Sequence, residues 1–309
     1  MIDLHCDTAS RLYYEKGKLK ENNFSVDIKK LNEARAKAQV FAHFIELDKC
    51  KNPYEEFLDM YNNFTNEINE NKNNIEIVRN INELNNANKN GRIGAFLSIE
   101  EGQVLQGDIN RVKEVYDLGI RIITLTWNFP NDIGYPNYEF IYKDKGLTDR
   151  GREIVCEMEK LGIIPDVSHL SDRGFYDVAE ICKKPFIASH SNSREVKYHS
   201  RNLKDDMIKK IAQKGGVIGI NFCNDFLGDS TISKVDDMIR HIGNIRNIGG
   251  IEVISLGSDF DGIDNKVEIS DISKIDLLAY NLKKHGFKES EIDKIFEKNA
   301  LRVFNDVLR

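Results

Sequence analysis

The chain has 309 residues, a length that fits two small domains or one α/β barrel of roughly 250 residues with additions. Its 40% hydrophobic and 30% charged residues are typical of a globular protein, and no apolar segment approaches the roughly 20 residues of a transmembrane helix. The net charge of −6 argues against the basic surface that binding to nucleic acid or anionic membranes needs, so we predict neither partner.

The N-terminal residues Met1–His5 do not form a basic segment followed by an apolar one, so we predict no signal peptide and a soluble, cytoplasmic protein. The five cysteines are scattered and contain no CxxC pair. This spacing favours reduced thiols over disulfides or a cysteine zinc site.

Short apolar segments alternate with amphipathic ones along the whole chain. Segments of strand length are Ile2–His5, Gln39–Glu46, Ile93–Ser98, Arg121–Thr126, Ile164–Ser168, Phe186–His190, Val217–Asn221 and Val253–Gly257. Helical patterns between or after them include Tyr54–Asn71, Asp149–Leu161, Asp205–Lys214, Val235–Asn247 and Ser290–Phe304. Eight such units predict an α/β protein whose residues 1–309 form a single (β/α)8 TIM barrel, although the alternation also fits a doubly wound sheet.

The longest irregular segment, Asn128–Gly146, follows the fourth predicted strand and contains Pro130, Gly134 and Pro136. These residues are typical of turns. A long loop in a compact domain is often functional, and a loop after a barrel strand lies on the catalytic face.

Side chains that bind metals stand at the ends of several predicted strands. His5 and Asp7 end the first strand and, being two residues apart, point to the same side. Glu100 follows the third strand, and we interpret the neighbouring Glu101 as an ordinary exposed loop carboxylate. Alone, each has a structural explanation, such as a hydrogen-bonded His/Asp pair.

Two histidines and an aspartate complete this pattern. His169 and His190 end the fifth and sixth strands, and Asp259 follows the eighth. A lone histidine at a strand end is usually a core residue, but several ligands on different strands are what a two-metal barrel site requires. The sequence therefore predicts a metal centre at the carboxyl ends of the strands.

Over nearly its full length the chain resembles the membrane (renal) dipeptidase family of binuclear zinc peptidases. The segments that carry the resemblance are Asp3–Thr8, Ser98–Gly102, Leu118–Thr126, Gly146–Gly151, Leu161–Ser171, Ile187–Ser191, Ser200–Asp206, Gly257–Gly262 and Asn299–Phe304. The stretch from Gly146 to Asp206 is the most specific. The resemblance implies a TIM barrel of the metal-dependent hydrolase type.

The resemblance also implies a ligand set for two Zn²⁺ ions. One zinc would be held by His5, Asp7 and Glu100, and the other by Glu100, His169 and His190. Glu100 would bridge the two ions and so take part in catalysis.

The implied reaction is hydrolysis of the amide bond of a dipeptide by a metal-bridged hydroxide. Asp259 would be the acid/base carboxylate, and Arg201 would bind the terminal carboxylate of the substrate. An alternative for Arg201 is a surface ion pair with Asp205 or Asp206. Tolerance for a D-residue at the C-terminal position and a homodimer are further expectations from the resemblance.

One position departs from the family pattern. Mammalian members carry a histidine directly after the fourth strand, where this chain has Trp127 and Asn128. The role of that histidine is therefore not carried over. Trp127 either forms an aromatic wall of the substrate pocket or closes the top of the barrel, and we expect Asn128 to donate a hydrogen bond to the substrate.

Two other functions fit the same residues. A two-metal barrel hydrolase acting on a cyclic amide, lactone or phosphoester would use the same ions and hydroxide. A non-catalytic barrel that binds a metal or a peptide is a second alternative, against which the acid/base candidate Asp259 argues.

Overall fold

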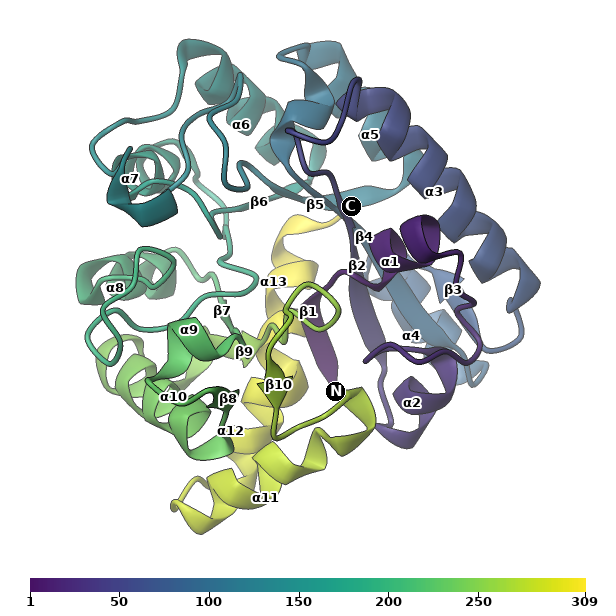
Figure 1. Cartoon of the computed structure of the whole chain (residues 1–309), viewed down its shortest axis with the longest axis vertical. Coiled ribbons are helices and arrows are strands. Elements are labelled where there is room, and N and C mark those ends of the chain that lie inside the picture. Colours follow the sequence, from purple (N-terminus) through teal and green to yellow (C-terminus); the bar gives the residue numbers. More distant parts are fainter.

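The computed structural model describes all residues, 1–309, and places a curved sheet of parallel strands at the centre of the molecule (Figure 1). The strand order is β6–β5–β4–β2–β1–β9–β7, with bounds β1 Ile2–Cys6, β2 Ala38–Phe44, β4 Ile93–Glu100, β5 Ile120–Thr124, β6 Ile164–Asp166, β7 Ile218–Ile220 and β9 Ile254–Leu256. Single parallel bridges from Ile187 to Asp166 and from Ala188 to Ile218 join β6 to β7. The ring is thereby closed, and the predicted (β/α)8 barrel is confirmed.

The sixth predicted strand, Phe186–His190, is wrong in one respect, because the structure has only isolated bridges there. The backbone N–H of Ser189 donates to the Asp166 carboxylate, and that of His190 donates to the Ser168 hydroxyl. Side chains thus take hydrogen bonds that a regular strand would make to its neighbours. Three short strands were not predicted: β3 Ile75–Ile77, which pairs with β4, and the pair β8 Ile232–Ser233 and β10 Lys266–Val267.

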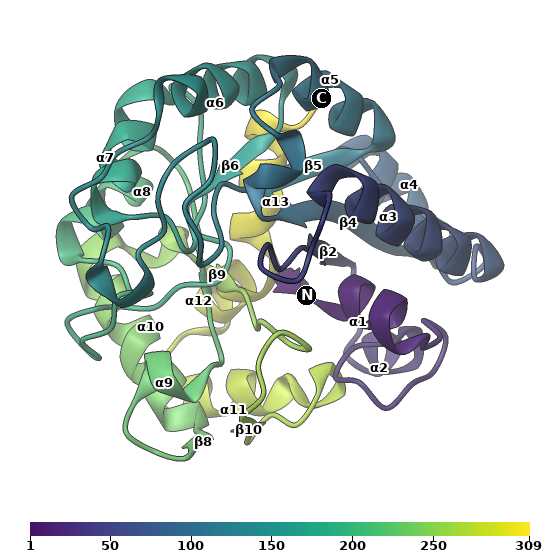
Figure 2. The same ribbon diagram turned by 45° about the horizontal axis from the view of Figure 1, so that its top comes forward.

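Helices surround the strands (Figure 2). Their bounds are α1 Thr8–Glu15, α2 Ile28–Glu33, α3 Pro53–Glu70, α4 Ile81–Lys89, α5 Ile109–Leu118, α6 Asp149–Leu161, α7 Asp172–Ile181, α8 Asp205–Gln213, α9 Asn224–Leu227, α10 Val235–Gly249, α11 Asp276–Lys284, α12 Glu289–Asp293 and α13 Asn299–Val307. The predicted helix Ser290–Phe304 is divided by a π turn at Lys294–Lys298. The other predicted helices are present within two residues of their expected ends.

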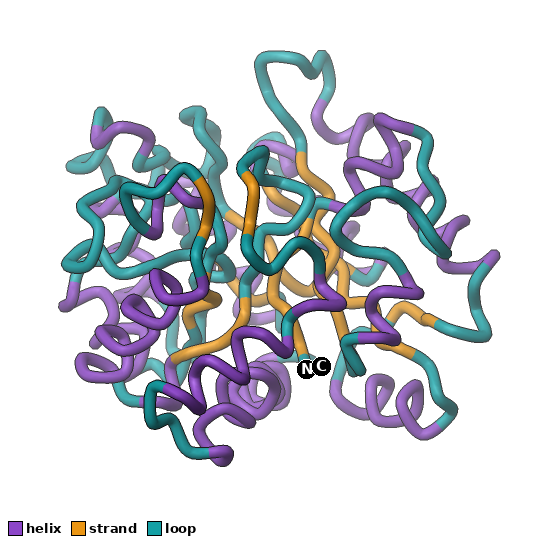
Figure 3. The backbone as a smooth tube through the Cα atoms, turned by 60° about the horizontal axis from the view of Figure 1, so that its bottom comes forward, coloured by secondary structure: helices purple, strands orange, loops and turns teal.

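Apolar side chains fill the interior of the barrel, and α13 packs against them. The rings of Phe96 on β4 and Phe304 on α13 lie 4.5 Å apart. In Figure 3 the longest loops extend from one end of the strands, and both chain termini lie at the other. None of the helices has the length and apolar composition that crossing a membrane requires.

Candidate metal centre

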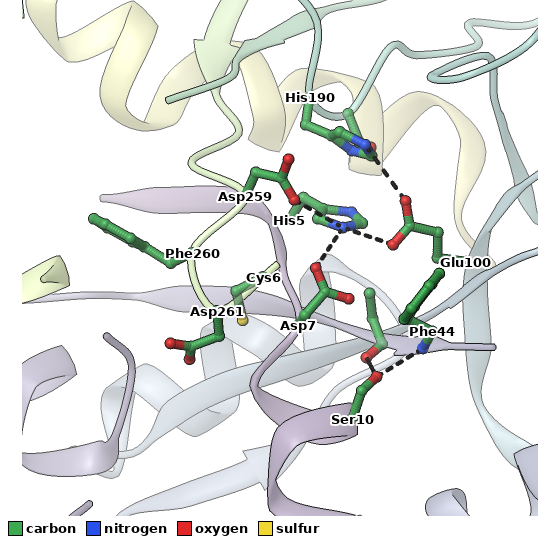
Figure 4. Close-up of polar contacts among 12 residues, drawn as sticks. His5, Cys6, Asp7, Ser10, Phe44, Glu100, His190, Asp259, Phe260 and Asp261 are labelled. Carbon is green, nitrogen blue, oxygen red and sulfur yellow. Dashed lines mark hydrogen bonds and ion pairs between the residues drawn. The ribbon is translucent and has the colours of Figure 1, made fainter. Parts of the chain in front are cut away.

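All six predicted metal-centre residues meet at the carboxyl ends of the strands, and each is at least nine-tenths buried. Figure 4 shows five of them, His5, Asp7, Glu100, His190 and Asp259, turned toward a common space. His169 and Asp259 both have left-handed backbones, with φ of 70° and 62°. Such strain costs about 1–3 kcal/mol per residue and occurs mainly at functional sites.

Glu100 lies between two sets of donor atoms. Its Oε2 is 3.2 Å from His5 Nε2, which is in turn 3.5 Å from Asp7 Oδ2. Its Oε1 is 3.2 Å from His169 Nε2 and 3.5 Å from His190 Nε2. Two ligands of one tetrahedral zinc ion, each at 2.0–2.1 Å from the metal, lie roughly 3.3 Å apart, so both sets have the spacing of a metal site.

The protonation states of two histidines also fit a cation. His190 Nδ1 contacts Ser189 Oγ, whose proton goes to Asp166, and His169 Nδ1 contacts Asn128 Oδ1. Both Nδ1 atoms must therefore carry the hydrogen, which leaves lone pairs on the two Nε2 atoms, 3.0 Å apart. Two lone pairs at this distance repel each other unless a cation lies between them.

Electrostatics lead to the same conclusion. Burial raises the pKa of Glu100 and of Asp259, and it lowers the pKa of His169 and His190 well below the usual value. Burial alone would lower the pKa of His5, but the nearby Glu100 and Asp7 outweigh it and raise this pKa. The neutral imidazoles of His169 and His190 beside desolvated carboxylates form a site that divalent cations would stabilise. His5 Nε2 and Asp7 Oδ1 also have no hydrogen-bond partner.

Contacts behind the candidate ligands hold them in place, and the sequence prediction missed them. Asp166 receives the Ser189 hydroxyl at 2.5 Å, and Ser189 lies 2.8 Å from His190 Nδ1. Asn221 donates to Asp259 Oδ2 at 2.8 Å, which leaves Oδ1 facing His5 at 3.8 Å. The position of Asp166 and Ser189 just before the two histidines was the available signal.

The predicted substrate residues lie around this centre. Trp127 and Asn128 line a groove of about 920 Å³ that also contains Asp7, Glu100, His169 and Asp259. Trp127 is half-buried, with its ring 4.8 Å from that of Phe44. Asn128 faces His169 through its side-chain oxygen, a contact that was not expected.

Arg201 is buried beside the centre and forms no ion pair. Its side-chain Nε has no hydrogen-bond partner, and Nη2 is 3.4 Å from the carbonyl oxygen of His190. The alternative of a surface ion pair with Asp205 or Asp206 is wrong, because Asp206 accepts from Tyr176 and Arg201 points into the molecule.

Glu101 corrects a second expectation, because it is fully buried rather than exposed. Its carboxylate accepts from the backbone N–H groups of Gln103 and Trp127 and from the Asn131 amide. Burial raises its pKa to about 7, and its φ of 107° lies in the region that favours glycine. Glu101 therefore anchors the loop that carries Trp127.

Comparison with known proteins adds independent information. The model of the membrane dipeptidase family, peptidase family M19, matches residues 1–309. An uncharacterized dipeptidase of Schizosaccharomyces pombe is 31% identical over 299 residues, which are 90% of this chain and 71% of the relative.

Solved structures with the same fold include dipeptidase AC, a metallopeptidase of family M19. It superposes with a TM-score of 0.90 at 22% identity and covers 99% of this chain and 98% of its own. A metallopeptidase of Rhodobacter sphaeroides, solved with a phosphinate mimic of the dipeptide L-Ala-D-Ala, gives a TM-score of 0.89 at 22% identity over 99% and 98% of the two chains.

Proposed function

Because the chain belongs to the membrane dipeptidase family, peptidase family M19, and is a metal-dependent dipeptidase, we propose that it works with two zinc ions. His5, Asp7 and Glu100 would hold one ion, and Glu100, His169 and His190 the other. The observation that carries this proposal is the position of Glu100, with one carboxylate oxygen 3.2 Å from His5 and the other 3.2 Å from His169. We also propose that residues 1–309 form one catalytic domain, since these ligands come from strands along most of the chain.

Zinc bound there would supply a Lewis acid for the scissile carbonyl and a water that ionises near neutral pH. Asp259 takes the proton released during attack and passes it to the leaving amine. Its Oδ2 is held by Asn221, so Oδ1 is the oxygen free to carry that proton.

Arg201 binds the carboxylate at the C-terminal end of the substrate. A buried guanidinium without an ion-pair partner favours an anionic ligand, and its planar donors match a carboxylate with two parallel hydrogen bonds. This contact favours dipeptides over longer peptides. The dipeptide mimic bound by the Rhodobacter protein has a D-residue at its C-terminal end, and we propose the same tolerance here.

A kinetic comparison of Asp259→Asn and Arg201→Ala tests these roles. Asp259→Asn should lower kcat by about 10²–10⁴-fold while metal content is retained. Arg201→Ala should mainly raise KM, by roughly 30- to 1000-fold, which corresponds to about 2–4 kcal/mol.

Amidation of the substrate's carboxylate provides the matched control. It should impair the parent enzyme strongly and add little to the Arg201→Ala defect, because the two changes remove the same contact. Equal losses in both proteins would show that Arg201 does not bind the carboxylate. Hydrolysis of lactones or cyclic amides without hydrolysis of dipeptides would favour the alternative two-metal hydrolase.

A further inference from the structure

A second cavity, of about 400 Å³, lies next to the metal centre. It shares Asn128, His169 and Phe226 with the larger groove, so the two spaces meet beside one candidate ligand. Arg201 lines the second cavity and not the groove. If Arg201 binds the C-terminal carboxylate of the substrate, as proposed above, that carboxylate lies beside this second cavity.

Five aromatic or imidazole side chains form one part of its wall. We call this part of the cavity the aromatic pocket and define it by Tyr138, Phe140, Tyr198, His199 and Phe226. The rings of Phe140 and Tyr198 stack 5.2 Å apart at an interplanar angle of 28°, and those of His199 and Phe226 lie 4.6 Å apart. Glu139 is the only carboxylate among the lining residues, and it is exposed at the rim.

Two rim residues leave much of their surface in water. Tyr198 is 77% exposed and Tyr138 is 45% exposed, and both line the same cavity, so their exposed surface is contiguous there rather than scattered. An apolar ligand group that fills the cavity would remove part of this aromatic surface from water, which favours binding. The aromatic part of the wall thus favours apolar groups, while Arg201, which also lines the cavity, provides a positive charge.

The backbone at the pocket is strained in a way that positions Phe140. Glu139 and Phe140 are consecutive residues with left-handed backbones, φ 50° and 62°. The turn before them is held by Asn137, whose side chain donates to Asp172 and to the Ser200 carbonyl. Such a backbone persists only where surrounding contacts impose it, and here those contacts fix the position of the Phe140 ring.

Geometry then identifies the group that enters the pocket. If Arg201 holds the C-terminal carboxylate, the side chain of the C-terminal residue is attached one carbon away from that carboxylate. The guanidinium carbon of Arg201 lies 5.3 Å from the centre of the Phe226 ring, so that side chain starts within reach of the aromatic walls.

We propose that the aromatic pocket receives the side chain of the substrate's C-terminal residue and selects large apolar and aromatic ones. This inference rests on the proposed dipeptidase function and on the role of Arg201. It assigns to this chain a substrate class, dipeptides with an aromatic or large aliphatic C-terminal residue, in either configuration at that position.

The test compares kcat/KM of the zinc-loaded protein for Ala-L-Phe, Ala-D-Phe and Ala-Gly. The parent should prefer the better phenylalanine substrate over Ala-Gly by at least about 10-fold. Tyr198→Ala and Phe140→Ala should each reduce this ratio, and the double variant should bring it down by roughly 10-fold. Tyr280→Ala, which removes a tyrosine that is 60% exposed on α11, is the matched control and should leave the ratio unchanged.

Binding of the product phenylalanine, measured by calorimetry against glycine, gives a second readout that does not depend on turnover. Binding of phenylalanine should weaken in both pocket variants and not in Tyr280→Ala. If the parent cleaves Ala-Gly and Ala-Phe equally well, or if the pocket variants keep the parent's ratio of kcat/KM values, the proposed role of the aromatic pocket is wrong. The dipeptidase function would remain intact. Absence of any dipeptide hydrolysis by the zinc-loaded parent overturns both.

Discussion

Ser189 connects a candidate metal ligand to a buried carboxylate. Its hydroxyl donates to Asp166 and accepts from His190 Nδ1, so it determines which nitrogen of the imidazole carries the proton. Ser189→Ala should weaken metal binding by about 10–100-fold, the usual effect of losing such a contact, when measured by competition with a chelator. Ser255→Ala removes a buried hydroxyl on β9 that has no hydrogen-bond partner, and it should leave the affinity unchanged. Equal metal affinities of the parent and Ser189→Ala would show that Ser189 does not orient His190 for metal binding.

Glu101 accepts hydrogen bonds through both carboxylate oxygens, and one of them holds the backbone of Trp127. In Glu101→Gln, an NH₂ group replaces one of the two accepting oxygens. It then faces an N–H donor, and that hydrogen bond is lost. We expect the free energy of unfolding to fall by about 1–3 kcal/mol. Trp127 is the only tryptophan, so its fluorescence should report the displaced loop. The exposed Glu195→Gln is the control, and an unchanged spectrum in Glu101→Gln would contradict the anchoring role.

At the scale of the elements, β7, β9 and the segment around Ser189 approach one another closely where the barrel closes. A Cβ on Gly219 would lie 1.9 Å from the Ser189 carbonyl oxygen and 2.8 Å from the Gly257 Cα. Gly219→Ala should therefore lower the free energy of unfolding by about 3 kcal/mol.

Gly243 in α10 provides the opposite case for the same substitution. Nothing lies within 4 Å of a Cβ added there, and Gly243→Ala should raise stability by about 0.5–1 kcal/mol. Denaturant titration measures both variants, and a similar shift in the two would show that close approach of the strands does not limit residue choice.

His241 joins helix α10 to the end of helix α9 and to the loop at Ser193. Its Nδ1 accepts from the Ser193 backbone N–H, and Nε2 donates to the Leu227 carbonyl, so only the neutral ring satisfies both contacts. Burial lowers its pKa to about 4, whereas a histidine in an unfolded chain titrates near 6.5.

Between these two pH values the unfolded chain binds more protons than the folded one. The free energy of unfolding should therefore fall as the pH drops from about 6.5 to about 4, with a contribution of about 3 kcal/mol from His241. The difference in unfolding free energy between the parent and His241→Gln, measured across this window, isolates that contribution. A difference that is constant with pH would contradict it.

For the whole molecule, the metal centre brings together side chains from segments between His5 and Asp259 in the sequence. Without cations, three buried carboxylates and two facing imidazole lone pairs would remain unbalanced. Purified protein should hold two divalent metals per chain, and removing them should lower the melting temperature by roughly 5–10 °C, since saturating binding contributes about 4 kcal/mol.

Elemental analysis and thermal unfolding test this prediction. Zinc should restore both metal content and melting temperature, and calcium should not, because nitrogen ligands suit zinc and calcium prefers oxygen. Saturation at one metal per chain in a protein with all five ligands intact would contradict the proposed two-zinc centre.

The local pattern of strands and helices was sufficient to predict the barrel and to predict that its candidate metal ligands lie close together. Alternating strands and helices predict parallel units, and parallel strands bring their carboxyl ends to one face. Side chains at those ends, such as His5, Glu100 and His190, were therefore expected to meet even though they are far apart in the sequence. The structure brings them together.

Only the tertiary structure decided which polar groups the fold buries and which loops lie side by side. Glu101 looks like a loop carboxylate in sequence but is buried beneath the Trp127 loop. Phe140 and Phe226 line one cavity, although they are 86 positions apart in the sequence and no periodicity connects them. The periodicity of apolar residues indicates which face of a helix or strand is buried. Contacts between loops depend instead on where the closed barrel places the ends of those loops.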